Sequence, residues 1–310
     1  MRTYTVACLS GDGVGPELMA EATRALHEVS RMHGFRVEDV HVPFGTEALT
    51  RSGHPLPLST RVAYLEAEAI LVASAGEPAL GGVEAELDLR ARATQVAFAG
   101  GSLLLVTPLS PQDEEWTVRR AFAMARERRG RLQTIDQDGP WAELVDAVAG
   151  DYDGVAVDHL SVAEGLPALA FQPERLDVVV AGTLFADALE EIVSLLDREG
   201  RVVARARLAG SGPGLFAPVH SAPAELAGQG MVDPAPALLA VSLLLAEGLG
   251  ERAAAGTLAS ALAEARRQGA RPLEAIKRGI AATTRELADA VLGLLPVTHR
   301  NAEFVREALL

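Results

Sequence analysis

Gly11-Asp12-Gly13-Val14-Gly15-Pro16-Glu17 is the stretch that decides the fold of this 310-residue chain. It follows a short apolar and β-branched run, Thr3–Leu9, which is typical of a buried strand. After it, apolar residues at helical spacing from Glu17 to His33 predict a helix that ends at Gly34. The turn between them is either a simple tight turn or a place where glycines let a ligand approach a helix N-terminus. Its spacing differs from the G-x-G-x-x-G fingerprint of Rossmann folds.

The alternation of strands and helices continues through the first two thirds of the chain. Apolar runs predict further strands, and longer periodic segments predict helices between them. The predicted strands are Phe35–Val42, Ala69–Ala73, Leu103–Thr107, Arg131–Ile135, Gly154–Val157 and Leu176–Ala181. The predicted helices are Thr60–Glu68, a segment from Asp113 to Arg129, Thr183–Glu199, Pro234–Leu249, Arg252–Gln268, Pro272–Leu294 and Asn301–Leu310. This pattern predicts an α/β sheet layered by helices.

Composition excludes several classes of partner. The chain has 42 acidic and 28 basic residues, a net charge of -14, which argues against binding to nucleic acid or to an anionic membrane surface. Its single cysteine, Cys8, excludes a disulfide within the chain and fits a reducing cytoplasm. No basic and then apolar leader follows Met1. The most apolar stretch, Ala235 to Leu249, is too short and too interrupted to span a bilayer, so we expect a buried core helix there.

Two further motifs lie in the C-terminal half. On the predicted helix from Thr183, Asp187 and Glu191 are four residues apart, which places both carboxylates on one helical face, as a hard divalent cation requires. Pro218-Val219-His220 leads into a glycine-containing loop that ends at Asp233-Pro234. Together with the first heptapeptide, these motifs resemble the isopropylmalate/isocitrate dehydrogenase family, whose members are β-decarboxylating, metal-dependent and NAD(P)-dependent enzymes.

The resemblance implies a two-domain α/β architecture. A large, nucleotide-domain-like domain would comprise residues 1–96 and 211–310, and a smaller dimerisation domain would comprise residues 97–210. The β-arm and tyrosine segment of the family are expected to be shortened or absent, because Thr107 is followed almost directly by the helix from Asp113. A homodimer is expected, with helices near 140–165 and 183–199 at its interface.

The resemblance also assigns a metal site. Asp187 and Glu191, with Asp158 supplied across the dimer, stand at the positions of the family's Mg²⁺ or Mn²⁺ ligands. Glu191 replaces an aspartate and is one methylene longer. The alternative interpretation is that Asp187 and Glu191 belong to a solvated acidic helix face.

A nucleotide site is assigned in the same way. His220 matches the family histidine near the adenine, and Glu225 stands where an acidic residue binds the adenosine ribose of NAD. Asp233 replaces the asparagine that reads the adenine. A packed, hydrogen-bonded loop histidine is the alternative for His220. We therefore expect no firmly bound cofactor, and NAD or Mg²⁺/Mn²⁺ as the ligands of any residual site.

The residues that carry the family's chemistry are missing. Gln137 stands where the resemblance places the catalytic lysine, and glutamine transfers no proton at neutral pH. Thr107 stands where one of three carboxylate-clamping arginines is expected. Arg90 and Arg92 lie near the other two expected positions but at a different spacing. None of the three tyrosines lies near the position where the resemblance places the tyrosine that serves as the acid. The sequence predicts no catalytic residue in the family sense.

Three functions follow from these losses. The first is a pseudoenzyme that binds or scaffolds a protein partner. The second is a sensor that keeps a pocket for a nucleotide, a carboxylate or a metal. The third is a diverged NAD(P)-dependent oxidoreductase acting on a 2-hydroxy acid, with His159 or Asp138 as its base.

Overall fold

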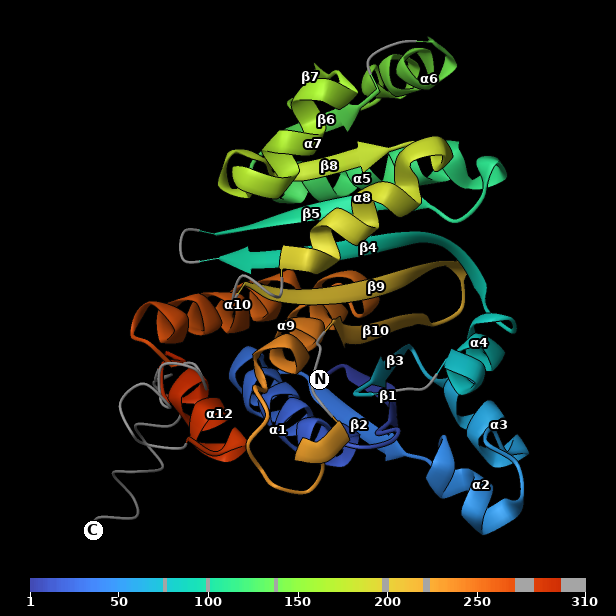
Figure 1. The fold of residues 1–310 in the computed structure, drawn as a ribbon, viewed down its shortest axis with the longest axis vertical. Helices are drawn as coiled ribbons and strands as arrows, with labels where there is room; N and C mark the ends of the chain where they lie inside the picture. Colours follow the sequence, from blue (N-terminus) through green and yellow to red (C-terminus); the bar gives the residue numbers. More distant parts are fainter. Residues whose placement is uncertain are drawn as a thin grey trace.

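The computed structural model describes residues 1–74, 77–98, 101–136, 139–196, 201–219, 224–270 and 282–296. Within these ranges the centre is a ten-stranded sheet in the order β2-β1-β3-β10-β9-β4-β5-β8-β6-β7 (Figure 1). The strands are β1 (Thr3–Leu9), β2 (Arg36–His41), β3 (Ala69–Val72), β4 (Asp88–Phe98), β5 (Gly101–Pro108), β6 (Arg131–Ile135), β7 (Ala156–Leu160), β8 (Val178–Ala181), β9 (Val202–Ser211) and β10 (Gly214–Val219).

The sheet is mixed. Strands β2, β1, β3 and β10 run parallel at one end, and β5, β8, β6 and β7 run parallel at the other. Between the two parallel halves, β10, β9, β4 and β5 pair antiparallel. The sheet therefore passes without a break through both parts of the predicted two-domain division, which stays a prediction.

Helices cover both faces of this sheet (Figure 1). Helices α1, α5, α9 and α10 pack on one face, α7 and α8 cover the β5–β8 half of the other face, and α3 and α4 cover its β1–β3 half. The α-helices are α1 (Gly15–His33), α2 (Thr46–Ser52), α3 (Leu58–Glu66), α4 (Glu77–Glu84), α5 (Glu114–Glu127), α6 (Gly139–Ala149), α7 (Val162–Phe171), α8 (Thr183–Leu195), α9 (Ala235–Leu243), α10 (Arg252–Arg267) and α12 (Thr284–Leu292). Short helical turns are η1 (Pro111–Asp113), η2 (Pro173–Arg175), η4 (Ala224–Leu226) and the π-helical turn η5 (Leu244–Gly248).

The predicted α/β fold is confirmed. The strands predicted at Thr3–Leu9 and Arg131–Ile135 have those bounds, and the apolar stretch from Ala235 forms the buried α9 and η5. Between β5 and η1 lie two residues, so no β-arm follows β5. Among the described residues, no helix is long and apolar enough to cross a membrane.

Several elements differ from the sequence prediction. The prediction omitted strands β4, β9 and β10 and helices α2 and α4, and it gave the region of α6 and α7 only as helices near 140–165. The segment 140–165 contains strand β7 between α6 and α7, so it is not helical throughout. Of the helix predicted over Pro272–Leu294, residues 284–292 are helical, and residues 271–281 and 301–310 lie outside the described ranges.

The first heptapeptide fixes how the N-terminal elements meet. A Cβ added at Gly15 would lie 1.9 Å from the carbonyl oxygen of Ser10, so α1 starts closer to β1 than any side chain permits. Asp12 Oδ1 accepts a hydrogen bond of 2.8 Å from the amide of Thr46, the first residue of α2. Glu17 Oε2 accepts one of 2.9 Å from the amide of Gly230. The motif therefore holds a helix and a distant loop in place.

We predict that Gly15→Ala lowers the free energy of unfolding by about 3 kcal/mol, at the upper end of overpacking costs, because the clashing atom is backbone. Gly81→Ala is the matched control, since Gly81 lies in α4 and a Cβ there meets no atom within 4 Å. In a helix interior this control should gain up to about 1 kcal/mol. Urea-unfolding midpoints measure both changes, and a Gly15→Ala protein as stable as the parent would refute the close-approach argument.

Candidate functional site

Three arginines line one face of the sheet below α8. They lie on the antiparallel strands β4 and β9, where Arg92 is opposite Arg207 and Thr94 is opposite Arg205. Residues two apart on a strand point to the same side, so these four side chains share a face. We call Arg92, Arg205 and Arg207 the arginine face. Like charges directly opposite each other repel, and this arrangement therefore requires compensating carboxylates.

Each arginine of this face has its own carboxylate. Asp187 Oδ1 lies 2.6 Å from Arg92 Nη2, and Glu84 Oε1 lies 2.5 Å from Arg207 Nε. The third pair joins Arg205 Nη2 to Glu190 Oε2 at 3.1 Å. Helices α4 and α8 supply these acids, so the same ion pairs neutralise the face and attach the helices to the sheet.

Glu190 is the central acid of this arrangement, with its side chain 5% exposed. It accepts hydrogen bonds from Thr94 Oγ1 at 2.7 Å and from Thr107 Oγ1 at 3.0 Å, in addition to the arginine. A buried carboxylate is costly unless it is paired and hydrogen-bonded, and here both conditions are met. Thr107, predicted at a lost arginine position, is thus a buried donor to Glu190.

The predicted metal ligands are not assembled in one chain. Asp187 and Glu191 share the exposed side of α8, and Asp187 is already bound to Arg92. Asp158 lies on the edge strand β7, where Arg131 is 3.5 Å away. The described part of the chain contains no group of three His, Cys, Asp or Glu side chains placed to hold an ion. These residues therefore do not fit a metal centre within a single subunit.

The residues predicted to bind a nucleotide are either far from one another or already bound to other groups of the chain. Glu225 lies in η4 and is exposed. Asp233 accepts a hydrogen bond from the amide of Ala235 at 3.0 Å, and its other oxygen pairs with Arg266. His220, like Gln137, lies outside the described residues. The described part of this loop therefore offers a nucleotide one exposed carboxylate, Glu225.

The candidate proton-transfer groups have structural partners. Tyr4 donates to Glu251 Oε1 at 2.7 Å and Tyr64 donates to Glu86, and burial raises the pKa of both phenols, away from neutral. Tyr152 stacks on Phe122 with ring centroids 5.1 Å apart. These three tyrosines therefore pack and hydrogen-bond within the core and its margins.

His159 and Asp138 are the residues that the sequence analysis named as alternative bases. His159 lies on β7 at the sheet edge, with Nε2 2.9 Å from Asp146 Oδ1. Asp138 lies outside the described residues. The histidine is thus oriented by a carboxylate, but it is on the edge strand, four strands away from the arginine face on β4 and β9.

Sequence reasoning missed Glu190, Arg205 and Arg207. One signal was available: in Val-Val-Ala-Arg-Ala-Arg-Leu, residues 202–208, arginines alternate with small apolar residues. This alternation is typical of a strand with one polar and one apolar face. No comparable signal distinguished Glu190 from Glu191, which are adjacent on α8.

Comparison with known proteins gives a consistent match. The isocitrate/isopropylmalate dehydrogenase family profile matches residues 5–98 and 104–291. The 3-isopropylmalate dehydrogenase of Synechococcus sp. (strain CC9605) is 30% identical over 323 residues, covering 84% of this chain and 90% of that protein. The enzyme of the same name from Salinibacter ruber is 31% identical over 311 residues, covering 82% and 85%.

Solved structures agree in fold. A β-decarboxylating dehydrogenase from Thermococcus kodakarensis superposes with a TM-score of 0.77 at 22% identity, over 94% of this chain and 96% of that one. An isocitrate dehydrogenase from Methylococcus capsulatus gives a TM-score of 0.75 at 22% identity, over 94% and 99%. At these identities the likeness concerns the fold.

We predict effects of very different size for two adjacent substitutions on α8. Glu190→Gln should lower the free energy of unfolding by about 2–3 kcal/mol, because it leaves Arg205 without its carboxylate. This is below the roughly 3–5 kcal/mol of a fully buried pair, since the Arg205 side chain is 26% exposed. Glu191→Gln, on the solvent side of the same helix, should change stability by less than about 0.5 kcal/mol. Equal losses in urea unfolding would contradict the structural role of Glu190.

Proposed function

Since the chain belongs to the isocitrate/isopropylmalate dehydrogenase family, we propose that it is a diverged member without oxidative decarboxylase activity, a pseudoenzyme that acts through its surface. The observation that carries this proposal is the closed charge balance of the arginine face. Arg92, Arg205 and Arg207 each pair with a carboxylate of the chain itself. A substrate carboxylate binding there would have to displace one of these acids.

The residues of the expected reaction support the same proposal. Oxidative decarboxylation of a 2-hydroxy acid needs a base, an acid and cations that hold the carboxylates. At two of these positions the chain has Gln137 and Thr107, and the hydroxyl of Thr107 is bound to Glu190. Loss of one proton-transfer group alone typically costs about 10²–10⁴-fold in rate. Losses at several positions should leave turnover near background.

A residual ligand site is the second candidate. One observation favours it: Nε of Arg92 is buried and has no acceptor among the described residues. A carboxylate or phosphate ligand would supply that acceptor if Asp187, whose side chain is 89% exposed, turned away. In this sensor function the Arg92–Asp187 pair opens on binding, and no chemistry follows.

A panel of ligands separates these candidates. NAD⁺, NADP⁺, Mg²⁺, Mn²⁺ and 3-isopropylmalate are tested singly and in pairs, by thermal shift and by formation of reduced nicotinamide. For the pseudoenzyme we expect no turnover and no shift, whereas a ligand at a hundred times its dissociation constant would add about 2.7 kcal/mol of stability. A 3-isopropylmalate dehydrogenase of the family serves as the positive control. Turnover above background would refute the pseudoenzyme, and a shift without turnover would favour the sensor.

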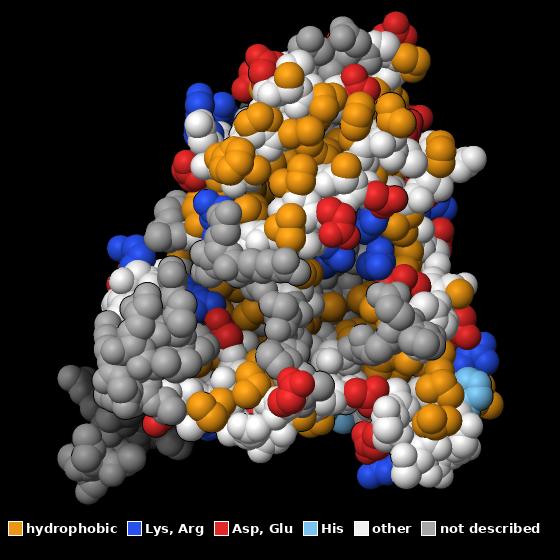
Figure 2. Space-filling view, viewed as in Figure 1, with side chains coloured by type: hydrophobic (Ala, Val, Ile, Leu, Met, Phe, Trp, Pro, Cys, Tyr) orange, Lys and Arg blue, Asp and Glu red, His pale blue; other side chains and the backbone are white. Residues whose placement is uncertain are grey.

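We also propose that the working surface includes a homodimer interface on α7 and α8. Large apolar side chains there are exposed: Leu184 by 83%, Phe171 by 76% and Leu195 by 48%. On α8, Leu184, Ala188 and Leu195 recur at helical spacing and form a solvent-facing stripe. Figure 2 shows hydrophobic side chains gathered over α7 and α8. Contiguous exposed apolar patches mark interaction sites, and a second copy carries the matching stripe.

We predict that Leu184→Glu converts a dimer to a monomer, because a charge within the stripe would be buried unpaired in the interface. Leu58→Glu is the matched control, since Leu58 is 72% exposed at the start of α3, away from α7 and α8. Sedimentation velocity at micromolar concentration distinguishes the species. A parent protein that sediments as a monomer, or a Leu184→Glu protein that remains dimeric, would refute this interface.

A further inference from the structure

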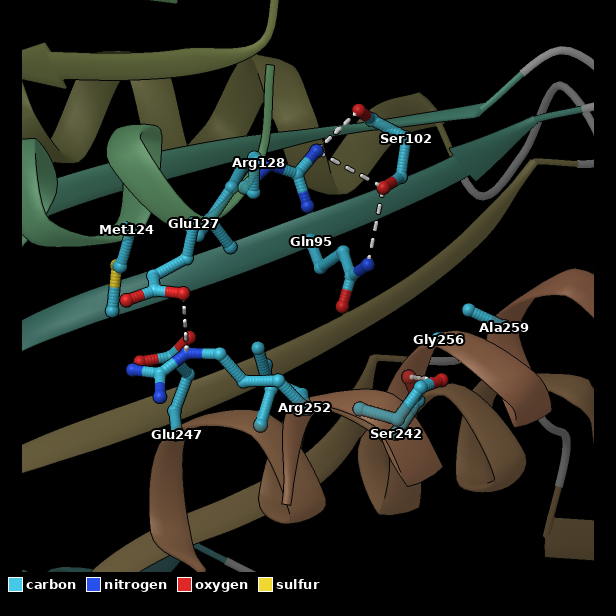
Figure 3. A pocket seen from close by; sticks show the side chains of 14 residues that line it. Gln95, Ser102, Met124, Glu127, Arg128, Ser242, Glu247, Arg252, Gly256 and Ala259 are labelled. Atoms are coloured by element: carbon cyan, nitrogen blue, oxygen red, sulfur yellow. Dashed lines mark hydrogen bonds and ion pairs between the residues drawn. The ribbon is translucent and has the colours of Figure 1, made fainter. Parts of the chain in front are cut away.

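A cavity of about 200 Å³ lies on the face of the sheet opposite the arginine face. Its walls come from β4, β5, α5, α9, η5 and α10 (Figure 3). Neighbouring residues of β4 point to opposite sides, so Thr94 faces the arginines and Gln95 faces this cavity. Because the sheet separates the two places, binding in this cavity does not depend on the proposed function.

Gln95 carries a polar atom that the described residues leave open. The residue is 6% exposed, and its Nε2 donates to Ser102 Oγ at 3.2 Å. No donor among the described residues is placed on its Oε1, which points across the cavity toward Ser242 and Gly256 (Figure 3). This oxygen is not among the fully buried atoms without a partner, so water or a ligand in the cavity can reach it. The cavity thus contains an acceptor suited to a hydroxyl or amino hydrogen of a ligand.

Charged side chains of both signs line the cavity: Glu127 and Glu247, Arg128, which is paired with Asp177, and Arg252. Arg252 is the first residue of α10, so its guanidinium adds to the positive end of that helix's dipole instead of compensating it. Its nearest carboxylate among the described residues is Glu127, with Oε2 3.9 Å from Arg252 Nε, the outer limit of an ion pair. The side chain is 42% exposed. An anionic ligand could therefore form an ion pair with Arg252, whose contact with Glu127 is long.

A buried carboxyl lines the same cavity. Glu247 belongs to the π-helical turn η5, a distortion that occurs frequently at functional sites. Its carboxylate lies 2.8 Å from Arg120 Nη2, and burial raises the pKa of Glu247 against the pull of Arg120 and Arg252. The carboxylate of Glu247 is paired with Arg120, so its negative charge is shared between two arginines and does not neutralise Arg252 completely.

Part of the remaining wall is apolar. Met124, Leu243 and Ala246 provide an apolar surface, and a Cβ added at Gly256 would meet no atom within 4 Å. The volume is below the roughly 300–1,000 Å³ of clefts that bind drug-sized ligands. It suits a ligand smaller than a drug-sized molecule.

We propose that this cavity binds a small hydroxycarboxylate with an apolar body. The carboxylate would lie beside Arg252 at the N-terminus of α10, and the body would lie against Met124 and Leu243. The hydroxyl would donate to Gln95 Oε1. The site is reached from the opposite side of the sheet to the arginine face, so its ligand is independent of any dehydrogenase substrate.

The test is a titration of the full-length protein with 4-hydroxybenzoate, by isothermal titration calorimetry. A ligand of this size should bind with a dissociation constant of about 1 mM. Benzoate, which lacks the hydroxyl, and 4-hydroxybenzamide, which lacks the charge, should each bind several-fold more weakly. Failure of 4-hydroxybenzoate to bind at ten times that concentration would overturn the proposal.

Two substitutions locate the binding. Gly256→Leu fills the cavity and should weaken binding at least about tenfold, whereas Gly81→Leu, in open space on α4, should leave it unchanged. Arg252→Gln should weaken binding several-fold, and Arg267→Gln, at the exposed far end of α10, should not. Circular dichroism checks folding. If Gly256→Leu fails to fold, the arginine pair decides the outcome. Undiminished binding to a folded Gly256→Leu or to Arg252→Gln would place the ligand elsewhere and overturn the proposal.

Discussion

The ion pairing beneath α8 is the constraint on which the centre of this structure depends. Two antiparallel strands place Arg92 directly opposite Arg207, and Arg205 lies two residues away. Charges so close and so shielded from water are tolerated only when each has a counter-charge. Helices α4 and α8 must therefore sit where Glu84, Asp187 and Glu190 reach the strands. The ion pairs that position these two helices also neutralise the three arginines.

The heptapeptide after β1 illustrates how a motif can keep its architectural role. Its residues bring α1 against β1 through Gly15, hold the start of α2 through Asp12 and anchor the loop at Gly230 through Glu17. None of these contacts requires a nucleotide or a substrate. A chain can therefore retain this sequence, and with it the family fold, after the residues of the family's reaction have changed.

The central sheet divides two polar regions of different character. On one face, Thr94 and the arginines are hydrogen-bonded or paired within the chain. On the other face, the amide oxygen of Gln95, the residue after Thr94, points into a cavity. Among the described residues, Arg252 beside this cavity forms only a long ion pair, with Glu127. Unused hydrogen-bonding capacity is costly in a buried place unless a ligand or water satisfies it. Within the described part of the chain, each face thus has an open polar group, Arg92 Nε on the first and Gln95 Oε1 on the second, and the cavity adjoins the second of these.

The sequence by itself determined the elements whose signals are local. The strands Thr3–Leu9 and Arg131–Ile135 are short runs bounded by turn residues, and the α/β class followed from their alternation with periodic helices. Strands β4 and β9 were missed because arginines interrupt their apolar pattern, and the acids that neutralise those arginines lie on other elements. Thr107 and Glu190 are 83 residues apart in sequence. Which of two adjacent glutamates enters the core depends on how α8 is rotated against the sheet, and only tertiary packing fixes that rotation.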